Sequence, residues 1–292
     1  VLFDFDWRFF RGGAQGAEAS DFDDVKWRRV DLPHDWSIED LPGTTSPFDP
    51  DAISQVNGGF TVGGTGWYRK TFNVGNEQQG KRIVIQFDGV YMNAEIWING
   101  QWLGTHPYGY TSFWFDLTDK IKFGASNLIV VKVRNEGENS RWYSGSGIYR
   151  HVWLNTFDPT HIAQWGTYIT TPAVSRESAA VEIKTKVLNE RGTVASTSLL
   201  TKFLDSKGVE VARAQSAQRI EPNSSYEFQQ TTNLTSPALW STDSPFLYTA
   251  ISEVLLDGQL VDRLETKFGV RKISFDVTNG FMLNGQPLKL KG

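Results

Sequence analysis

Cysteine is absent from all 292 residues of the sequence. Its absence excludes disulfides, thiolate metal sites and cysteine nucleophiles. It does not identify the compartment, because many exported bacterial proteins also lack cysteine. The compartment therefore stays open, with a periplasmic or secreted bacterial location favoured over a cytoplasmic one.

Excess positive charge and long apolar runs are also missing. The 29 Lys and Arg residues against 33 Asp and Glu residues give a formal net charge of −4, so no basic field is available to hold nucleic acid or anionic lipid. No apolar run reaches the roughly eighteen residues that a membrane-spanning helix needs. We therefore expect neither a nucleic-acid partner nor a membrane partner.

Familiar metal, phosphate and nucleophile motifs are missing as well. The four histidines do not stand at metal-ligand spacing, and the acidic pairs Asp49/Asp51 and Glu136/Glu138 lack the pattern of a calcium loop. A solvated surface is therefore the expected role of those pairs. The glycine-rich segment 57–66 lacks the Gly-Lys-Ser/Thr ending of a phosphate loop, and no nucleophile elbow is visible. The residues predict no cofactor, no metal and no catalytic group.

Aromatic residues, by contrast, are plentiful. The segment 91–115 holds eight of them around the pair Asn99-Gly100. This pair suits the two positive φ angles of a type I′ turn and predicts a β-hairpin. The segment continues into a glycine-containing turn at 106–110. Such loops indicate a β-sandwich that could present rings to flat ligands such as sugars.

The distribution of tryptophan marks a domain boundary. Nine of the eleven tryptophans precede position 154, where alternating apolar runs without a helical period predict an all-β domain of sandwich or jelly-roll type over residues 1–160. Seven strand-like runs predict an immunoglobulin-like sandwich over residues 161–270. The remaining segment, 271–292, is too short to bury a core. Both ends of the chain lie in strand-like sequence, so we expect it to be part of a longer protein.

Several sequence blocks resemble those of glycoside hydrolase family 2, in particular bacterial β-galactosidases, and they follow one another in family order. The blocks are residues 32–36, 66–70, 87–91, 94–100, 140–154, 239–248 and 281–292. The resemblance implies a sugar-binding jelly roll (1–160), an immunoglobulin-like domain (161–270) and the truncated entrance to a (β/α)8 barrel (271–292).

The resemblance also implies where the chemistry occurs. In that family both catalytic glutamates of the retaining mechanism lie on the barrel, which needs roughly 250 residues. This chain should therefore contain no catalytic residue and hydrolyse nothing by itself. Its expected partners are a β-galactoside, the missing barrel and, through apolar surface where that barrel would dock, a second copy in a homo-oligomer.

Loops of the jelly roll reach over the barrel mouth in the family and help to form the substrate pocket. The matching positions here are Asn57, Gly58, Gly59, Phe60, Ser140, Arg141, Trp142 and Tyr143. The resemblance implies that Asn57 and Arg141 hydrogen-bond sugar hydroxyls and that Trp142 offers a stacking face. Ser140 stands where some members carry an aspartate that contacts galactose and a monovalent ion, so no metal site is predicted.

Three alternatives stay open. The residues alone favour a 140–150 loop anchored by Trp142 packing on its own sandwich over a ligand-facing loop. The aromatic loops also fit a stand-alone carbohydrate-binding module. Finally, the 140–150 block looks more like β-galactosidases, but a β-glucuronidase or β-mannosidase parent remains a competing interpretation.

Overall fold

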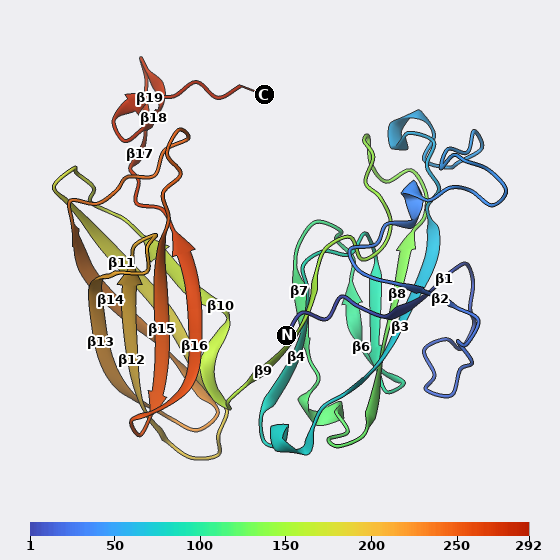
Figure 1. Cartoon of the computed structure of the whole chain (residues 1–292), viewed down its shortest axis with the longest axis horizontal. Coiled ribbons are helices and arrows are strands. Elements are labelled where there is room, and N and C mark those ends of the chain that lie inside the picture. Colours follow the sequence, from blue (N-terminus) through green and yellow to red (C-terminus); the bar gives the residue numbers. More distant parts are fainter. Residues whose placement is uncertain (292) are drawn as a thin grey trace. The chain divides into compact units, whose positions relative to one another are not determined.

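The computed structural model describes residues 1–291 and divides into two compact units, Val1–Thr156 and a second unit that begins at Phe157 (Figure 1). The all-β prediction is confirmed, because strands make up nearly all of the regular structure and the helices among the described residues are short 3-10 turns. None of these helices has the length and apolarity needed to cross a membrane.

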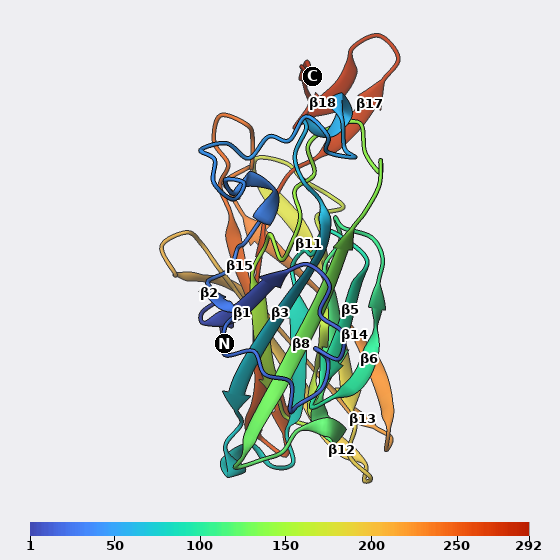
Figure 2. The ribbon, with the colours of Figure 1, turned by 90° about the vertical axis from the view of Figure 1, so that its right-hand side faces the viewer.

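The first unit contains a six-stranded and a three-stranded sheet. The larger sheet has the order β2-β1-β3-β8-β5-β6 with antiparallel neighbours, and Figure 2 shows its strands. Its strands are β1 (Trp7–Arg11), β2 (Arg28–Val30), β3 (Gly64–Asn73), β5 (Ala94–Ile98), β6 (Gln101–His106) and β8 (Ser126–Asn135). The smaller sheet has the order β7-β4-β9, formed by β7 (Phe113–Asp116), β4 (Arg82–Phe87) and β9 (Val152–Phe157).

The predicted hairpin is present. Strands β5 and β6 are joined by Asn99 at φ 51° and Gly100 at φ 78°. Both residues are therefore in the left-handed region that a type I′ turn requires. The Asn99 side chain also donates to the Lys120 carbonyl at 2.8 Å, which ties the turn to a neighbouring segment.

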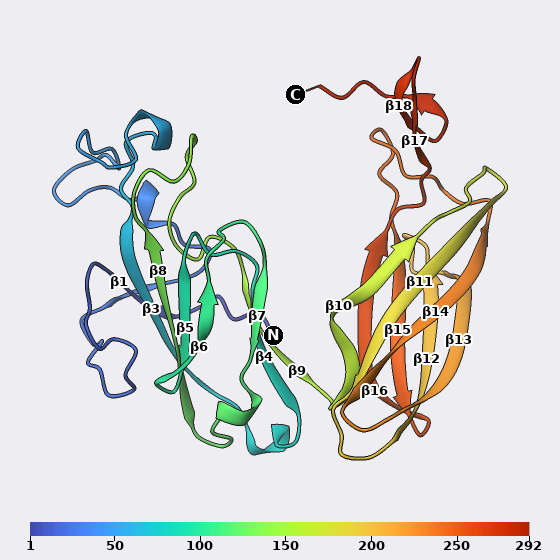
Figure 3. The same cartoon turned by 180° about the vertical axis from the view of Figure 1, so that it is seen from behind.

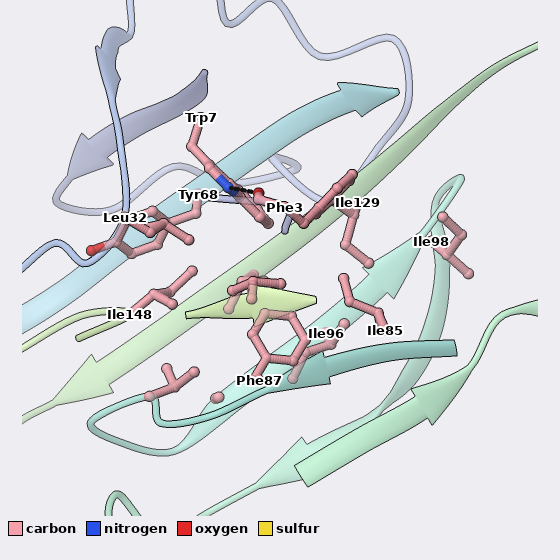
Figure 4. Packing of buried hydrophobic residues seen from close by; sticks show 14 of the residues in the cluster. Phe3, Trp7, Leu32, Tyr68, Ile85, Phe87, Ile96, Ile98, Ile129 and Ile148 are labelled. Atoms are coloured by element: carbon pink, nitrogen blue, oxygen red, sulfur yellow. Dashed lines mark hydrogen bonds between the residues drawn. The ribbon is translucent and has the colours of Figure 1, made fainter. Parts of the chain in front are cut away.

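The main core of the first unit is a continuous cluster that is rich in aromatic rings (Figure 4), and a smaller, separate cluster contains Ala17, Trp67, Leu128 and Val130. Alternate residues point inward along each strand, so β5 buries Ala94, Ile96 and Ile98. Trp7 is fully buried and satisfies its indole N–H by donating to the Phe3 carbonyl at 3.0 Å. Each large side chain buried in this way stabilises the fold by roughly 1.5–3 kcal/mol.

The two ends of the first unit are held together. The Phe3 N–H donates to the Val152 carbonyl at 2.8 Å, and the Val152 N–H donates to the Asp4 carboxylate at 2.8 Å. The other Asp4 oxygen lies 2.6 Å from Nδ1 of His151, and Leu2 forms a β-bridge with Trp153. Residues 2–4 therefore close this unit by joining its last strand.

Residues 160–268 of the second unit form the seven strands that the sequence predicts for a sandwich (Figure 3). One sheet has the order β10-β11-β14 and the other the order β13-β12-β15-β16. The strands are β10 (Thr160–Thr170), β11 (Ser178–Asn189), β12 (Ala195–Leu204), β13 (Glu210–Ile220), β14 (Ser224–Thr235), β15 (Tyr248–Leu256) and β16 (Gln259–Phe268).

A layer of polar residues divides the core of the second unit into two apolar clusters. On each of four strands, the inward position between the clusters is polar: Thr185, Thr201, Gln230 and Ser252, all buried. The Thr201 hydroxyl donates to Gln230 Oε1 at 2.7 Å, and Gln230 Nε2 donates to the Leu199 carbonyl at 3.0 Å. We call these four residues the polar layer.

The last described segment forms a small antiparallel sheet of β17 (Ile273–Asp276), β18 (Gly280–Leu283) and β19 (Gln286–Pro287). Phe275 on β17 is 82% exposed. The described residues contain no strand–helix repeat of a barrel, so the predicted barrel entrance at 271–292 stays a prediction.

Candidate functional site

A cleft of about 290 Å³ lies in the first unit between two loops, residues 49–64 and 135–145. Arg11 at the end of β1 and Ser37 on the 3-10 turn η1 (Trp36–Ile38) complete its lining. The lining mixes carboxylates, amides and hydroxyls with apolar atoms. Such a mixture complements a hydroxyl-bearing ring, which has polar edges and apolar faces.

Asp35 holds the second loop in place. One of its carboxylate oxygens accepts from the Ser37 N–H at 2.9 Å and from the Ser146 N–H at 2.8 Å, and the other accepts from the Tyr143 hydroxyl. A carboxylate with three donors makes strong, charge-assisted hydrogen bonds. Gly145 is at φ +69°, and a side chain there would collide with Asp35. Asp35 therefore fixes the loop at both Tyr143 and Ser146.

A buried group of hydroxyls and amides joins the two loops. The Ser37 hydroxyl donates to the Val62 carbonyl at 2.8 Å in the first loop, and its oxygen lies 2.7 Å from the Ser146 hydroxyl in the second, from which it can accept. Asn135 Nδ2 donates to the same Ser146 hydroxyl at 2.7 Å. Gly63 lies so close to the Asn135 carbonyl that any side chain would clash. The two cleft walls are therefore connected beneath the cleft by hydrogen bonds of the buried Ser37 and Ser146 side chains.

Carboxylates dominate the charge of the cleft. Asp49 and Asp51 lie on one wall and Glu136 and Glu138 on the other, while Arg11 is the one guanidinium in the described lining. The two acidic pairs that the sequence analysis assigned to solvated surface thus both reach this cleft, at positions that remain open to water. The net negative charge disfavours anionic ligands, and the carboxylates, amides and hydroxyls of the lining offer hydrogen-bond partners to neutral, hydroxyl-rich ones.

Ionisable groups around the second loop are tuned by burial. Burial, followed by the hydrogen bond to Asp35, raises the pKa of Tyr143 well above its usual range. Tyr143 therefore stays a donor to Asp35 at neutral pH and is not a base. Burial also lowers the pKa of Arg11, against the opposing charges of Glu39 and Asp49. The described residues contain no group of three His, Asp or Glu side chains that could hold a metal.

Of the first predicted loop, residues 57–60, Gly58 lines the cleft and the Asn57 side chain does not. Gly58 is buried and lines the cleft at the end of the 3-10 turn η2 (Val56–Gly58). Asn57, on the same turn, is exposed and lies outside the lining. Gly59 (φ 70°) and Phe60 (φ 56°) then reverse the chain in the left-handed region. The loop thus brings backbone rather than the Asn57 side chain to the cleft.

Of the second predicted loop, residues 140–143, only part lines the cleft. Ser140 lines the cleft, although its hydroxyl donates to the Trp142 carbonyl at 2.6 Å. Arg141 and Trp142 are exposed and lie outside the lining. Tyr143 contacts Asp35. The structure therefore brings Ser140 and Gly58 to one cleft and directs the Trp142 ring elsewhere.

Four residues of the site escape the sequence analysis: Arg11, Asp35, Ser37 and Asn135. Asp35 lies in a recognised block, and an aspartate before a tryptophan-led turn is an ordinary N-cap signal, so the capping of Ser37 could have been found. Its bond to Ser146 could not, because that contact crosses 111 residues of sequence. Asn135 is the last residue of β8 and Arg11 the last residue of β1, and neither carries a local signal.

Comparison with protein-family models finds two matches that together cover most of the chain. The glycosyl hydrolases family 2 sugar-binding domain matches residues 6–158, and the glycosyl hydrolases family 2 domain matches residues 160–271. Among curated proteins, the chain is 43% identical over 291 residues to beta-galactosidase BoGH2A of Bacteroides ovatus, covering 99% of this chain and 34% of that protein. It is 31% identical over 317 residues to a beta-glucuronidase of Formosa agariphila, covering 99% and 31%.

Solved structures give the same result. A glycosyl hydrolase family 2 member from Bacteroides cellulosilyticus matches with a TM-score of 0.97 and 45% identity, over 100% of this chain and 38% of that one. A beta-glucuronidase from glycoside hydrolase family 2 matches with a TM-score of 0.89 and 30% identity, over 99% and 32%. The chain thus spans about a third of the length of the relatives it matches.

Proposed function

Because the chain belongs to glycoside hydrolase family 2, we propose that it forms the accessory, non-catalytic part of a retaining β-galactosidase that releases terminal β-D-galactose. The supporting observation is the braced cleft between loops 49–64 and 135–145, where residues from both predicted pocket-wall loops meet. In the complete enzyme these walls would orient the terminal sugar, while a barrel outside this chain supplies the acid/base and the nucleophile.

Galactoside is favoured over glucuronide for an electrostatic reason. Four carboxylates and one guanidinium line the cleft, so a uronic acid carboxylate would meet net repulsion there. The 43% identity to a β-galactosidase supports the same choice, whereas relatives described as β-glucuronidases are less similar. Arg11 is the group that would have to pair with a uronate if the parent were a β-glucuronidase.

The deciding experiment compares two proteins. A longer protein that continues this chain through a barrel should hydrolyse an aryl β-galactoside with retention of configuration, and the 292-residue chain alone should not. Aryl β-glucuronide and aryl β-mannoside serve as matched substrates. Faster hydrolysis of either one, or genuine turnover by the 292-residue chain, would refute the proposal.

A stand-alone carbohydrate-binding module is the second candidate, favoured by exposed rings such as Trp142. Calorimetric titration of the chain with galactose and lactose separates the two functions. A Kd tighter than about 1 mM, or ~4 kcal/mol, would favour the module. The proposed function predicts little or no binding of these small sugars, because the cleft walls alone enclose only part of a sugar.

A further inference from the structure

Three aromatic rings gather at the surface of the first unit beside the cleft. Trp142 is 60% exposed, Tyr108 is 55% exposed and Tyr110 is 38% exposed. Two come from the turn before β7 and the third from the 140–147 loop, so they are more than thirty residues apart in sequence but share one contact network. We call Tyr108, Tyr110 and Trp142 the ring surface.

The ring surface is held in place although it is exposed. The Trp142 indole N–H donates to the Tyr110 hydroxyl at 2.9 Å. The Tyr110 ring makes edge contacts with Tyr108, at 5.6 Å between centroids, and with Tyr91, at 5.2 Å. Tyr91 itself is only 3% exposed and belongs to the core side of the turn. Rings fixed before a ligand arrives lose little conformational entropy on binding.

The turn below the rings is pinned as well. Gly109 packs directly on the Tyr91 ring, with no space for a side chain. The Tyr149 hydroxyl donates to the Gly109 carbonyl at 2.8 Å. The turn thus has two attachments to the body of the unit, and its tyrosines are presented outward by a rigid support.

The ring surface adjoins the cleft through short links. The Tyr91 hydroxyl donates to Asn139 Oδ1 at 3.1 Å, and Asn139 lines the cleft. Ser140, also in the lining, donates to the Trp142 carbonyl at 2.6 Å. A ligand that leaves the cleft on this side therefore meets the exposed rings next.

We propose that the ring surface binds the sugar residues of a neutral oligosaccharide that extends out of the cleft. This inference rests on the proposed function for the cleft and adds the chain length of the substrate to it. Pyranose rings have apolar C–H faces that stack on aromatic faces, and the phenol groups of Tyr108 and Tyr110 can hydrogen-bond hydroxyls at the ring edges. None of the three side chains is charged, so the ring surface itself supplies no cation to pair with the carboxylate of a uronate.

Ligand-observed NMR titration of the 292-residue chain tests the proposal, with β-1,4-galactotetraose as the probe and galactose as the single-ring comparison. The tetraose should bind with a Kd above about 1 mM but measurably more tightly than galactose. Trp142→Ala and Tyr108→Ala should each weaken tetraose binding about two- to tenfold, since an aromatic contact of this kind contributes about 0.5–1.5 kcal/mol.

Trp102 offers a matched control, because it is also 60% exposed but lies on β6 outside the ring surface. Trp102→Ala should leave tetraose binding unchanged. Trp142→Phe keeps an aromatic face without the indole N–H and should retain more affinity than Trp142→Ala. Equal affinity in the wild type and both alanine variants, or an equal loss in Trp102→Ala, would overturn the proposal.

This titration needs no hydrolysis, so it fails or succeeds separately from the proposed function. An inactive longer protein together with ring-dependent tetraose binding would refute the enzyme proposal and support the ring surface. An active β-galactosidase whose 292-residue chain shows no ring-dependent binding would do the reverse.

Discussion

The two units bury their cores in different ways. The first has one large continuous cluster, in which aromatic residues such as Trp7 and Phe87 pack with aliphatic ones, and a small separate cluster around Trp67. The second has two smaller clusters, on either side of the polar layer. A continuous core gains its stability from apolar area and close packing, whereas a divided core adds hydrogen bonds that are satisfied only in one register. A shift in strand register would cost the first unit its close packing. The same shift would cost the second unit the hydrogen bonds of its polar layer.

The largest expected effect comes from opening the continuous core. Trp7→Ala should lower the free energy of unfolding of the first unit by about 3–5 kcal/mol, because it removes a fully buried ring and leaves a cavity. Denaturant unfolding followed by tryptophan fluorescence measures it, since nine of the eleven tryptophans precede residue 154. A loss below about 1 kcal/mol would show that the cluster collapses around the gap.

The polar layer should respond to loss of a partner rather than loss of volume. Gln230→Leu removes the acceptor of Thr201 and the donor to the Leu199 carbonyl, and we expect it to cost the second unit about 1–3 kcal/mol. The double variant Thr201→Val/Gln230→Leu should cost less than the sum of its single changes, because both groups become apolar together. Hydrogen exchange of peptides from the second unit measures these losses. Additive losses would contradict the coupling.

Substitution of Asp35 tests whether the 140–147 loop can loosen without loosening the core of the first unit. Asp35→Ala should destabilise the first unit by about 1.5–3 kcal/mol, since hydrogen bonds to a charged group are lost at Ser37, Ser146 and Tyr143. Faster amide exchange should be confined to residues 140–147 and the turn η1. Tyr143→Phe removes one of the three bonds and should give a smaller loss in the same peptides. Exchange that rises evenly through the unit would contradict a local clamp.

The smallest expected effect is on the pH dependence of stability, to which His34 in the first unit and Asp262 in the second contribute with opposite signs. Burial lowers the pKa of His34 below its ordinary value of 6.5, so the unfolded state takes up the proton more readily and the first unit loses stability as the pH falls below that value. Burial raises the pKa of Asp262 above its ordinary value of 3.8, so the second unit gains stability as the pH falls through the raised pKa towards that value.

Hydrogen exchange at several pH values between 4 and 7.5 would measure both slopes in one sample. His34→Gln should flatten the slope of the first unit in the range below pH 6.5, and Asp262→Asn should flatten that of the second unit. Hydrogen bonds lower the pKa values of Glu177 and Asp276 in the second unit, which act in the opposite direction to Asp262, so the variants decide the assignment. A slope that His34→Gln or Asp262→Asn leaves unchanged in its own unit would contradict it.

The sequence predicts the parts of the fold that depend on neighbours along the chain. The hairpin at Asn99-Gly100 follows from two residues that tolerate positive φ, and the strands of the second unit follow from their alternation. The polar layer is invisible at this level, because Thr201 or Gln230 in an alternating strand looks the same whether it faces solvent or core. Only the packing of the sheet that holds β11 and β14 against the sheet that holds β12 and β15 brings those residues together.

The candidate site is predicted least well for the same reason. Segments 57–60 and 140–143 are identified by resemblance, but the cleft between them depends on Ser37 and Asp35, which lie about a hundred residues from Ser146. The separation of Trp142 from the cleft depends on its bond to Tyr110, again a contact between distant segments. Local patterns identify which loops to consider, and long-range hydrogen bonds decide which side chains each loop presents.

The joining of residues 2–4 to strand β9 has a consequence for biosynthesis. Because Asp4 finds its partners at His151 and Val152, a nascent chain cannot complete the first unit until more than 150 residues have left the ribosome. Contacts of such long sequence separation form slowly. Until they form, residues 2–4 and the edge of β9 that they pair with are both exposed to aggregation. We expect ribosome-associated chaperones to bind the growing polypeptide mainly in this interval. Asp4→Ala, which removes the bonds to His151 and Val152, should prolong that binding.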